Sequence, residues 1–411
     1  MINFTKIKLG DVGNITTGRT PNTSDAENFG SEYMFLGPTD LHKHFIITKS
    51  EKYITGKGLA SVNSSVIDGL SICVGCIGWD MGNVALVNEK CATNQQINSI
   101  TKVKDEYHPY YIYYWLKGKK DFLFQQANVT RTPILNKTDF SNIDIWLPSK
   151  SQQDKIANIL STIDEKIEVN NKISAKLEAM AKLIYDYWFV QFDFPDENGK
   201  HYKSSGGKMI YNEELKCDIP EGWTNTPLSK ITPVGNSSVN PADYPNKNFR
   251  HFSIPVYDAT NTFGIEAGET IGSNKFLVEE EDILVSKLNP RFRRVIFATE
   301  EEDLICSTEF VVWRTPNNGI KNFLYMLAIS PQFTAHCTQS ATGTSNSHKR
   351  VNPEVMMRFE LPFDKKVAGA LGRKLEPMIK TILINQRENT ELVKLRDWLL
   401  PMLMNGQVTV E

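Results

Sequence analysis

The stretch QQDKIANILSTIDEKIEVNNKISAKLEAMAKLIYDYWFV, residues 152–190, decides the fold of this chain. Its apolar seam runs through positions 156, 160, 163, 167, 170, 174, 177, 181, 184 and 188, in alternating steps of four and three. This spacing is typical of a coiled coil. The sequence therefore predicts a long helix that pairs with another helix along the seam.

A second stretch, residues 367–406, repeats this pattern: VAGALGRKLEPMIKTILINQRENTELVKLRDWLLPMLMNG. The matched apolar pairs are Ile156 with Leu371, Leu160 with Leu375, Ile163 with Met378, Ile167 with Ile382, Leu177 with Leu392 and Ile184 with Leu399. Asn170 and Asn385 occupy the same place on the two seams, and a buried Asn there fixes register and partner. We expect the two helices to pack on each other; the alternative, in which both Asn face solvent, stays open. The residues assigned to helix pairing and partner docking are Leu160, Ile163, Ile167, Asn170, Leu177, Ile184, Trp188, Ile382, Asn385, Leu392, Leu399 and Leu403.

Helix boundaries follow from proline and from acidic residues. Pro377 suits a first helical turn, so the second long helix is predicted to begin near it, after a short helix over 366–375. Asp164 and Glu165 are placed in the first turn of the corresponding earlier helix. Each long helix then has about 28 residues and a length of about 40 Å.

The segments before the two helices also echo each other. CATNQQINSIT (91–101) is matched by CSTEFVVWRT (306–315), and each segment then passes through a Thr-rich stretch before a strand that ends in Leu-Pro. Short strands broken by Gly, Pro and Asn dominate the segments. The predicted fold is α+β, with two domains of mixed α/β character separated by two long, antiparallel coiled-coil helices in an internal pseudo-two-fold repeat. The expected boundaries are 1–150, 151–217, 218–364 and 365–411.

Composition narrows the classes of function. With 40% hydrophobic and 23% charged residues the chain is an ordinary globular protein. The lack of a long apolar run and of a signal-peptide layout predicts a cytoplasmic protein without a membrane partner. Cys73 and Cys76 form a CxxC pair without a second pair, which favours buried structural thiols over zinc. A net charge of −2 argues mildly against nucleic acid unless the basic residues cluster locally.

Motifs for catalysis are missing from the sequence. No GxxxxGK[ST] loop and no Ser-His-Asp constellation is present. The nearest fragment to an adenine-methyltransferase motif, Asn289-Pro290-Arg291-Phe292, lacks the second proline, and no glycine-rich cofactor loop accompanies it. We therefore expect no catalytic residue, no metal and no cofactor in this chain.

Four motifs carry a resemblance to a known family. They are QQDKIANILSTIDEKIEVNNKI (152–173), the run WFVQFDFP, KSSGGKM and IPEGW between Trp188 and Trp223, TGTS (342–345), and LRDWLLPMLMNGQV (395–408). In this order they resemble the specificity subunit of type I restriction-modification systems along the whole chain. The resemblance implies two target-recognition domains, each of which reads half of a split, asymmetric site on double-stranded DNA. It also implies helical regions that serve as a spacer.

The same resemblance implies the partners. The helical regions would dock two adenine-N6 methyltransferase subunits, and restriction adds ATP-dependent translocase-nuclease subunits. S-adenosylmethionine, ATP and Mg would then belong to the partner subunits. Two alternatives stay open: a stand-alone DNA-binding regulator or antirestriction decoy of the same architecture, and a nuclease or methyltransferase with a degenerate motif. Stable assembly with a methyltransferase would favour the specificity subunit, and cofactor binding by the isolated chain would favour the enzyme.

Candidate DNA contacts come from basic and small polar stretches, because cations bind phosphates and polar side chains read base edges. In the second domain the candidates are Lys287, Asn289, Arg291, Arg293, Arg294, Thr344, Ser345, Asn346, His348, Lys349 and Arg350. In the first domain they are Arg19, Thr20, Trp79, Asp80, Gln95, Asn128, Thr130 and Arg131.

Two further stretches contain residue types that can contact DNA bases. Asn94, Gln95 and Gln96 are of types that pair with adenine, but the aligned residues 309–311 are largely apolar, so only Gln95 is retained. The aromatic run HPYYIYYWL (108–116) is predicted to be a core helix rather than a base-stacking platform.

Overall fold

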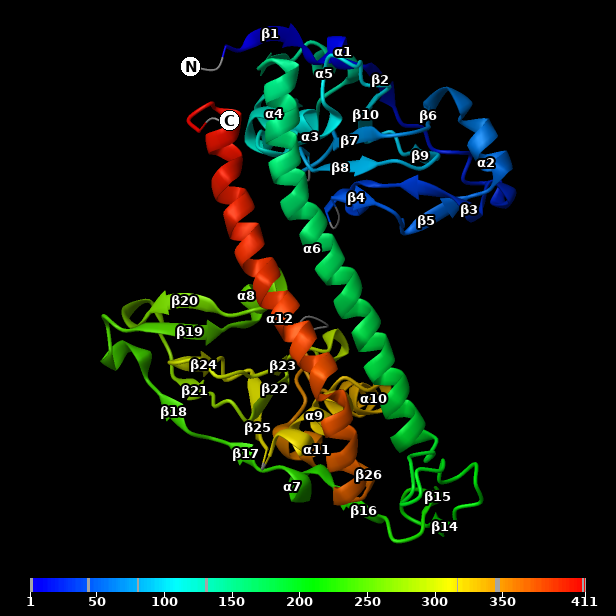
Figure 1. Cartoon of the computed structure of the whole chain (residues 1–411), viewed down its shortest axis with the longest axis vertical. Coiled ribbons are helices and arrows are strands. Elements are labelled where there is room, and N and C mark those ends of the chain that lie inside the picture. The colour runs from blue at the N-terminus through cyan, green and yellow to red at the C-terminus, as the bar shows by residue number, and fades with distance from the viewer. Residues whose placement is uncertain are drawn as a thin grey trace. The chain divides into compact units, whose positions relative to one another are not determined.

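The computed structural model describes residues 3–42, 45–79, 81–129, 132–315, 317–343, 348–408 and 410. The chain forms two compact units: unit 1 is Met1–Asn171 with Glu388–Glu411, and unit 2 is Lys172–Arg387. Two long helices, α6 (Lys150–Tyr185) and α12 (Lys365–Met404), each begin in one unit and end in the other (Figure 1). No helix in the described part of the chain is both long and apolar enough to cross a membrane.

Unit 1 is built on two small sheets. In spatial order the first contains β2 (Asn14–Thr17), β10 (Ile97–Thr101), β7 (Ser71–Gly75), β8 (Val84–Val87) and β4 (Ile46–Ile47). The second contains β5 (Lys52–Ile54), β3 (Phe29–Leu36), β9 (Cys91–Thr93) and β6 (Val66–Ile67). Two-stranded pairs are β1 (Thr5–Lys8) with β13 (Asp144–Leu147) and β11 (Asn128–Val129) with β12 (Pro133–Ile134). The helices are α1 (Leu9–Val12), α2 (Gly56–Ser61), α3 (Pro109–Lys117), α4 (Lys120–Gln125) and α5 (Lys137–Ser141), with 3₁₀ turns η1 (Ala26–Asn28), η2 (Pro38–His42) and η3 (Asn63–Ser65).

The aromatic helix α3 lies at the centre of the core of unit 1. Tyr111, Tyr113 and Tyr114 are fully or almost fully buried, and Leu400 and Leu403 of α12 join the same cluster. The prediction of a core helix over the aromatic run is confirmed. Cys73 and Cys76 are also buried, as predicted, and burial raises the pKa of Cys73 to about 11 and that of Cys76 to about 12.

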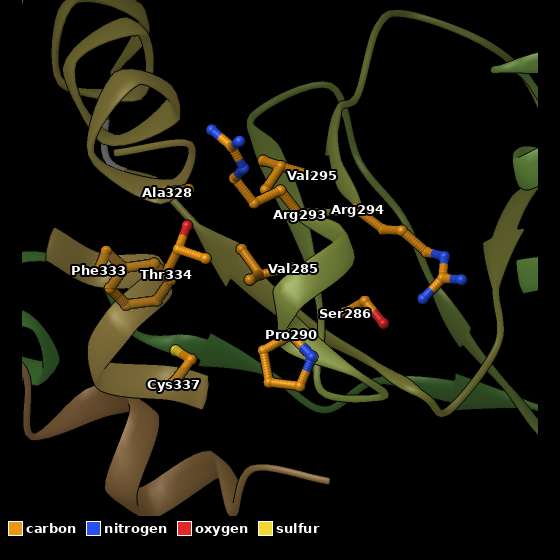
Figure 2. A pocket seen from close by; sticks show the side chains of 10 residues that line it. All are labelled: Val285, Ser286, Pro290, Arg293, Arg294, Val295, Ala328, Phe333, Thr334 and Cys337. Atoms are coloured by element: carbon orange, nitrogen blue, oxygen red, sulfur yellow. The ribbon is translucent and has the colours of Figure 1, made fainter. Parts of the chain in front are cut away.

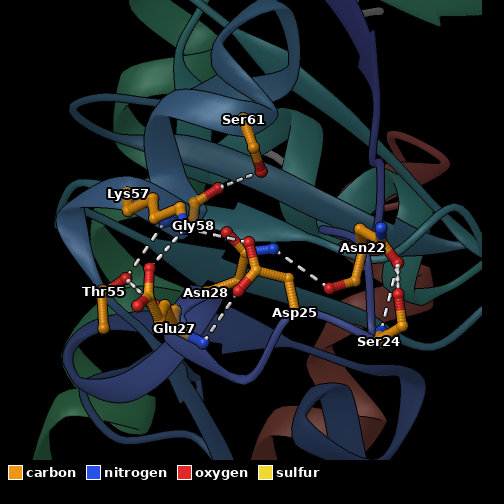
Figure 3. A network of polar contacts seen from close by, with 9 residues as sticks. All are labelled: Asn22, Ser24, Asp25, Glu27, Asn28, Thr55, Lys57, Gly58 and Ser61. Atoms are coloured by element: carbon orange, nitrogen blue, oxygen red, sulfur yellow. Dashed lines mark hydrogen bonds and ion pairs between the residues drawn. The ribbon is translucent and has the colours of Figure 1, made fainter.

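A polar network joins η1 to the start of α2 (Figure 3). Thr55 caps α2 by accepting a hydrogen bond from the Gly58 amide at 3.1 Å, and its hydroxyl donates to the Glu27 carbonyl at 2.7 Å. Lys57 pairs with Asp25 at 3.0 Å and with Glu27 at 2.5 Å. Its ammonium lowers the pKa of Asp25, but at this exposed site the pairs mainly order the turn.

Unit 2 also contains two sheets. The first has the order β17 (Val234–Gly235), β25 (Phe310–Arg314), β22 (Asp282–Ser286) and β23 (Val295–Phe297). The second has the order β18 (Ser238–Val239), β21 (Lys275–Leu277), β24 (Leu304–Cys306), β19 (Asn248–Phe252) and β20 (Gly264–Ala267). Two-stranded pairs are β14 (Met209–Asn212) with β15 (Cys217–Pro220) and β16 (Thr224–Pro227) with β26 (Glu360–Phe363). The helices are α7 (Leu228–Ile231), α8 (Ile254–Thr260), α9 (Asn318–Ala328), α10 (Pro331–Gln339) and α11 (Pro353–Met357); the short turns are η4 (Asp186–Val190), η5 (Pro241–Asp243), η6 (Gly268–Thr270) and η7 (Pro290–Phe292).

The boundaries predicted for both long helices are wrong. Helix α12 is one element of 40 residues that contains Pro377 in its interior, and α6 has 36 residues and begins ahead of Asp164. A proline in a helix interior costs about 3 kcal/mol. Leu371, Leu375 and Ile379 lie around Pro377 and are buried in the core of unit 2, and each such side chain contributes about 1.5–3 kcal/mol. The free energy gained by burying these side chains therefore outweighs the cost of the proline in the helix.

The two long helices contact each other within each unit. In unit 1 the Asn170 amide donates to the Glu388 carboxylate at 2.7 Å and to the Asn389 side chain at 3.0 Å. In unit 2 the Asn385 amide donates to the Ser174 hydroxyl at 3.2 Å. Asn170 and Asn385 are both buried, so the alternative of two solvent-facing Asn residues is excluded.

Candidate nucleic-acid interface

Three loops meet where strand β7 of unit 1 ends. The Cys76 amide donates to the Gln96 carbonyl at 2.8 Å, and the Leu135 amide donates to the Cys76 carbonyl at 2.9 Å. Two residues after Cys76, the Gly78 amide donates to the Pro133 carbonyl at 3.0 Å. Strand β7, the β9–β10 turn and β12 are thereby held together although their sequences are far apart.

The segment that contains Arg19 and Thr20 joins the same junction. The Gly18 amide donates to the Ile97 carbonyl at 3.0 Å, and the Thr20 hydroxyl donates to Gln95 Oε1 at 2.6 Å. A Cβ atom on Gly18 would lie 2.0 Å from the Asn94 carbonyl oxygen, so only glycine permits this close approach. The structure thus brings the predicted Thr20 and Gln95 into direct contact.

Trp79 follows this strand end and is 73% exposed, with its ring tilted against Phe124 at a centroid distance of 5.8 Å. Arg19 is exposed beside Thr20. Asp80, Thr130 and Arg131, together with the side chain of Asn128, lie outside the described residues.

The end of strand β22 in unit 2 shows the same arrangement of hydrogen bonds. The Lys287 amide donates to the Glu309 carbonyl at 2.9 Å, and the Val351 amide donates to the Lys287 carbonyl at 3.0 Å. The Asn289 amide donates to the Lys349 carbonyl at 2.7 Å. Asn289 has a φ of +47° and Gly78 in unit 1 has a φ of +92°, so both strand ends turn through the left-handed region.

Basic side chains surround this second junction. Arg291, Arg293 and Lys349 are exposed, and the Arg291 guanidinium lies 4.7 Å from the centroid of the exposed Phe292 ring. Figure 2 shows that Arg293 and Arg294 leave the turn in different directions. The cavity beside them has a volume of about 10 Å³, enough for one water molecule at most, so it offers no ligand site. His348 is exposed, whereas Thr344, Ser345 and Asn346 fall outside the described residues.

The arginines of unit 2 differ in what they are free to bind. The Arg294 side chain is 12% exposed and donates to both Asp258 oxygens, at 2.5 and 2.7 Å, and to the Leu288 carbonyl at 3.3 Å. Most of the Arg294 N–H groups therefore donate to acceptors within the protein. The Arg350 side chain is 45% exposed and pairs with Glu309, which raises the pKa of the Arg350 guanidinium through their hydrogen bond.

The structure corrects the counterparts assigned to residues 94–96. The Asn94 amide donates to Leu36 on β3, and the Ser307 amide donates to Phe252 on β19. Ile97 and Phe310 then begin the next strands, β10 and β25. Gln95 therefore matches Thr308, and Gln96 matches Glu309, rather than Phe310 and Val311. Alignment on the shared Cys failed because Cys91 begins β9 whereas Cys306 ends β24.

The helix-pairing candidates face different surroundings. Leu160, Leu399 and Leu403 pack in or against the core of unit 1, and Ile184 packs against that of unit 2. Trp188, placed on the seam by the sequence, lies in the π-helical turn η4 and is buried in the core of unit 2. Its place on the seam stays a prediction. Of the others, Ile163 and Ile382 are buried, and Ile167, Leu177 and Leu392 are half-buried.

Sequence reasoning missed Glu309 and a set of exposed apolar residues on the long helices. The latter include Leu183, Ile384, Leu395 and Trp398. The exposed apolar residues could have been noticed in the sequence, because they occupy helix positions outside the predicted seam. Within the described ranges, no group of three or more His, Cys, Asp or Glu side chains is placed to hold a metal ion.

Comparisons with known proteins find similarity to one family. Residues 1–179 match the model of the type I restriction modification DNA specificity domain. The type I restriction enzyme MjaIX specificity subunit of Methanocaldococcus jannaschii is 26% identical over 98% of this chain and 93% of its own. Over nearly its whole length the chain is similar to a type I restriction enzyme specificity subunit. The resemblance predicted from its motifs is confirmed.

Two further comparisons agree. The type I restriction enzyme HindI specificity subunit of Haemophilus influenzae is 34% identical over 39% of this chain and 36% of its own. The crystal structure of an S subunit from M. genitalium superposes with a TM-score of 0.63 at 16% identity, over 98% of this chain and 96% of that one. The latter likeness shows that the mixed helix-and-sheet fold with long helices is shared.

Proposed function

We propose that the chain is the sequence-specific DNA-binding subunit of a type I restriction-modification system. It reads a bipartite, asymmetric site and directs partner subunits that methylate adenine at N6 or cleave DNA. It is not itself an enzyme. The comparisons do not favour the regulator or decoy of the same architecture.

One observation carries this proposal: the same three-loop junction is built in each unit but bears different side chains. Gln95 and Gln96 of unit 1 stand where unit 2 has Thr308 and Glu309, and Ile134 stands where unit 2 has Arg350, as the hydrogen bonds at both strand ends align them. Two similar scaffolds with different polar faces suit two different half-sites, because base edges are read by side chains.

Charge at the junction of unit 2 fits a DNA backbone despite the net charge of −2. Lys287, Arg291, Arg293 and Lys349 supply cations for phosphates, which set the register of a reader on the duplex. Two acidic residues elsewhere in unit 2 are paired internally: Asp303 with Lys247 at 2.5 Å, and Glu301 with Arg387 at 2.9 Å. In unit 1 the corresponding contacts are assigned to Arg19, Thr20, Trp79 and Gln95.

The finer architecture also belongs to the proposal. The regions 1–150 and 218–364 are the target-recognition domains, and 151–217 and 365–411 are the helical regions. The long helices form an antiparallel coiled coil, and the chain is a pseudo-two-fold repeat. Contacts of Asp164 with Arg396 and of Asn170 with Asn389 support opposite helix directions within unit 1, since one number rises as the other falls.

The partners follow from the family. Two methyltransferase subunits and the restriction-translocase subunits assemble on the helical regions, and S-adenosylmethionine, ATP and Mg bind to them. The exposed apolar residues of α6 and α12 support such docking, because apolar surface rimmed by polar residues marks protein interfaces.

Methylome sequencing of the source strain against a deletion of this gene tests the proposal. Loss of one split, asymmetric N6-methyladenine motif is the expected result, and it would reveal both half-sites. A methylome that stays unchanged although the methyltransferase gene is expressed would overturn the proposal in favour of a decoy.

A further inference from the structure

We propose that Arg350 reads the guanine of one G·C pair in the half-site of unit 2, and that Glu309 is the residue that positions it. This inference rests on the proposed function and adds the chemical identity of one base. Its basis is the contact between the two side chains at the end of β22, where Lys349 and Val351 bond to the backbone of the turn after β22 and Glu309 lies in the β24–β25 turn.

The backbone holds both residues in place. The Arg350 amide donates to the Thr342 carbonyl at 2.8 Å, and the Thr342 amide donates back to the Arg350 carbonyl at 2.9 Å. Arg350 also forms a bridge with Leu288. Glu309 is held through its amide, which donates to the Ser307 hydroxyl at 3.2 Å, and through its carbonyl, which accepts from Lys287 at 2.9 Å. These hydrogen bonds therefore fix the backbone of both residues from which the paired side chains extend.

Glu309 accepts hydrogen bonds along one edge of the Arg350 guanidinium, and the N–H groups of another edge remain for a further acceptor. Arg350 Nε lies 3.0 Å and 3.2 Å from the two carboxylate oxygens, and Nη2 lies 3.1 Å from Oε1. Nη1 makes a long contact of 3.5 Å with the His348 carbonyl. The remaining N–H groups of Nη1 and Nη2 form the parallel fork at the tip, which matches guanine O6 and N7.

Charge favours a base over a phosphate as the target of this fork. The Glu309 carboxylate neutralises the guanidinium, and it would repel a phosphate brought to the same place. A neutral, preoriented donor pair loses little by facing uncharged acceptors in the major groove. The neighbouring Arg291, Arg293 and Lys349 are exposed and better suited to phosphates.

Two other arginines beside acidic residues in unit 2, Arg294 and Arg314, lack this combination. The Arg294 guanidinium donates to Asp258 and to the Leu288 carbonyl. The Arg314 guanidinium donates to the buried Asp282 at 3.0 Å and pairs with Glu279 at 2.7 Å. At the matching place of unit 1, Ile134 replaces Arg350, and the Thr20–Gln95 pair presents different groups. The expected guanine therefore belongs to the half-site of unit 2 alone.

The test selects preferred sequences from a randomised duplex library with the full chain, purified with its methyltransferase partner. Arg350→Lys keeps the charge but removes the fork; Glu309→Gln keeps the size but puts an amide donor beside the guanidinium. We expect both variants to lose discrimination at the same single G·C pair, by about fivefold to a hundredfold for Arg350→Lys. Arg291→Ala is the control, and it should weaken all sequences equally and lower the salt slope by about one.

A chemical probe checks the atoms involved. Replacing the assigned guanine by 7-deazaguanine removes the N7 acceptor, so it should weaken the wild-type complex and leave Arg350→Lys unchanged. Hypoxanthine at the same place keeps O6 and N7 and should bind the wild type as guanine does.

The outcomes separate the two proposals. If the wild type selects no split sequence, the proposed function fails. If it selects one but the two variants disturb different positions, or all positions alike, the guanine assignment is overturned while the function stands. A purely structural ion pair would give that second pattern, because loosening the loop affects every contact it makes.

Discussion

Asp164 is a carboxylate buried within unit 1, with its side chain 3% exposed. It accepts a hydrogen bond from the Tyr114 hydroxyl at 2.7 Å and pairs with Arg396 at 2.6 Å. Burial is the largest single influence and lowers the pKa of Arg396, but the charges and hydrogen bonds of Asp164 and Asp397 together raise that pKa above its ordinary value. The pair joins α6 to α12 where both pack on α3.

Removal of Arg396 should therefore be costly. We expect Arg396→Met to lower the free energy of unfolding by about 3 kcal/mol, because it removes the nearer cation of the buried Asp164 and leaves only Lys117 at 3.9 Å. Chemical denaturation of the full chain, followed by hydrogen exchange in unit 1, measures this. The exposed Lys394→Met is the matched control and should change stability by at most about 0.5 kcal/mol. The double variant Asp164→Leu with Arg396→Met should recover most of the loss; failure to recover would contradict a charge-based cause.

At the scale of the element, α12 continues through Pro377 because its buried face holds it. Pro377 is exposed and lacks the N–H that would donate to the Arg373 carbonyl. Pro377→Ala should therefore raise the free energy of unfolding by up to about 3 kcal/mol. Denaturation against the exposed Lys374→Ala measures the gain. No gain over that control would mean that the helix has adapted to the proline.

The same helix exposes Trp398 and Leu395, three residues apart on one face of α12. Trp398 is 60% exposed, so it contributes little to the core, yet exposed Trp residues often carry the energy of an interface. Trp398→Ala should weaken methyltransferase binding by at least about 2 kcal/mol, or about thirtyfold in Kd, without unfolding unit 1. Co-purification and titration test this against Lys394→Ala on the adjoining turn. Unchanged affinity would place the docking surface elsewhere.

At the scale of the whole molecule, both long helices pass between the units, α6 at Asn171 and α12 at Arg387. One heptad inserted in each helix at these points adds about 10 Å at 1.5 Å per residue. At 3.4 Å per base pair, the unread gap of the DNA site should grow by about three base pairs. Methylome sequencing measures the gap directly.

The control is the same heptad placed in α6 alone, which shifts Asn170 and Ser174 against their partners in α12. That variant should lose methylation rather than lengthen the gap, because the helix register is broken. A gap that stays constant when both helices grow would show that they do not set the spacing.

Local patterns in the sequence determined much of this protein. The presence of a long helix α6, the buried aromatic helix α3, the buried thiols and the family motifs could all be predicted, because each depends on residues close together in the chain. Arg19, Thr20, Gln95 and the basic stretches were predicted as DNA contacts from residue type, but their grouping at two strand ends was not predicted.

Tertiary structure decided the rest. Arg294 and Arg350 both lie in basic stretches of the sequence. Asp258, 36 residues away, binds the Arg294 guanidinium, whereas Glu309, 41 residues away, orients the Arg350 guanidinium. The continuation of α12 through Pro377 and the burial of Trp188 depend on the core of unit 2. The register that matches Gln96 with Glu309 depends on strand pairing. In each case a long-range contact supplies the deciding free energy, and no short window of sequence contains both partners.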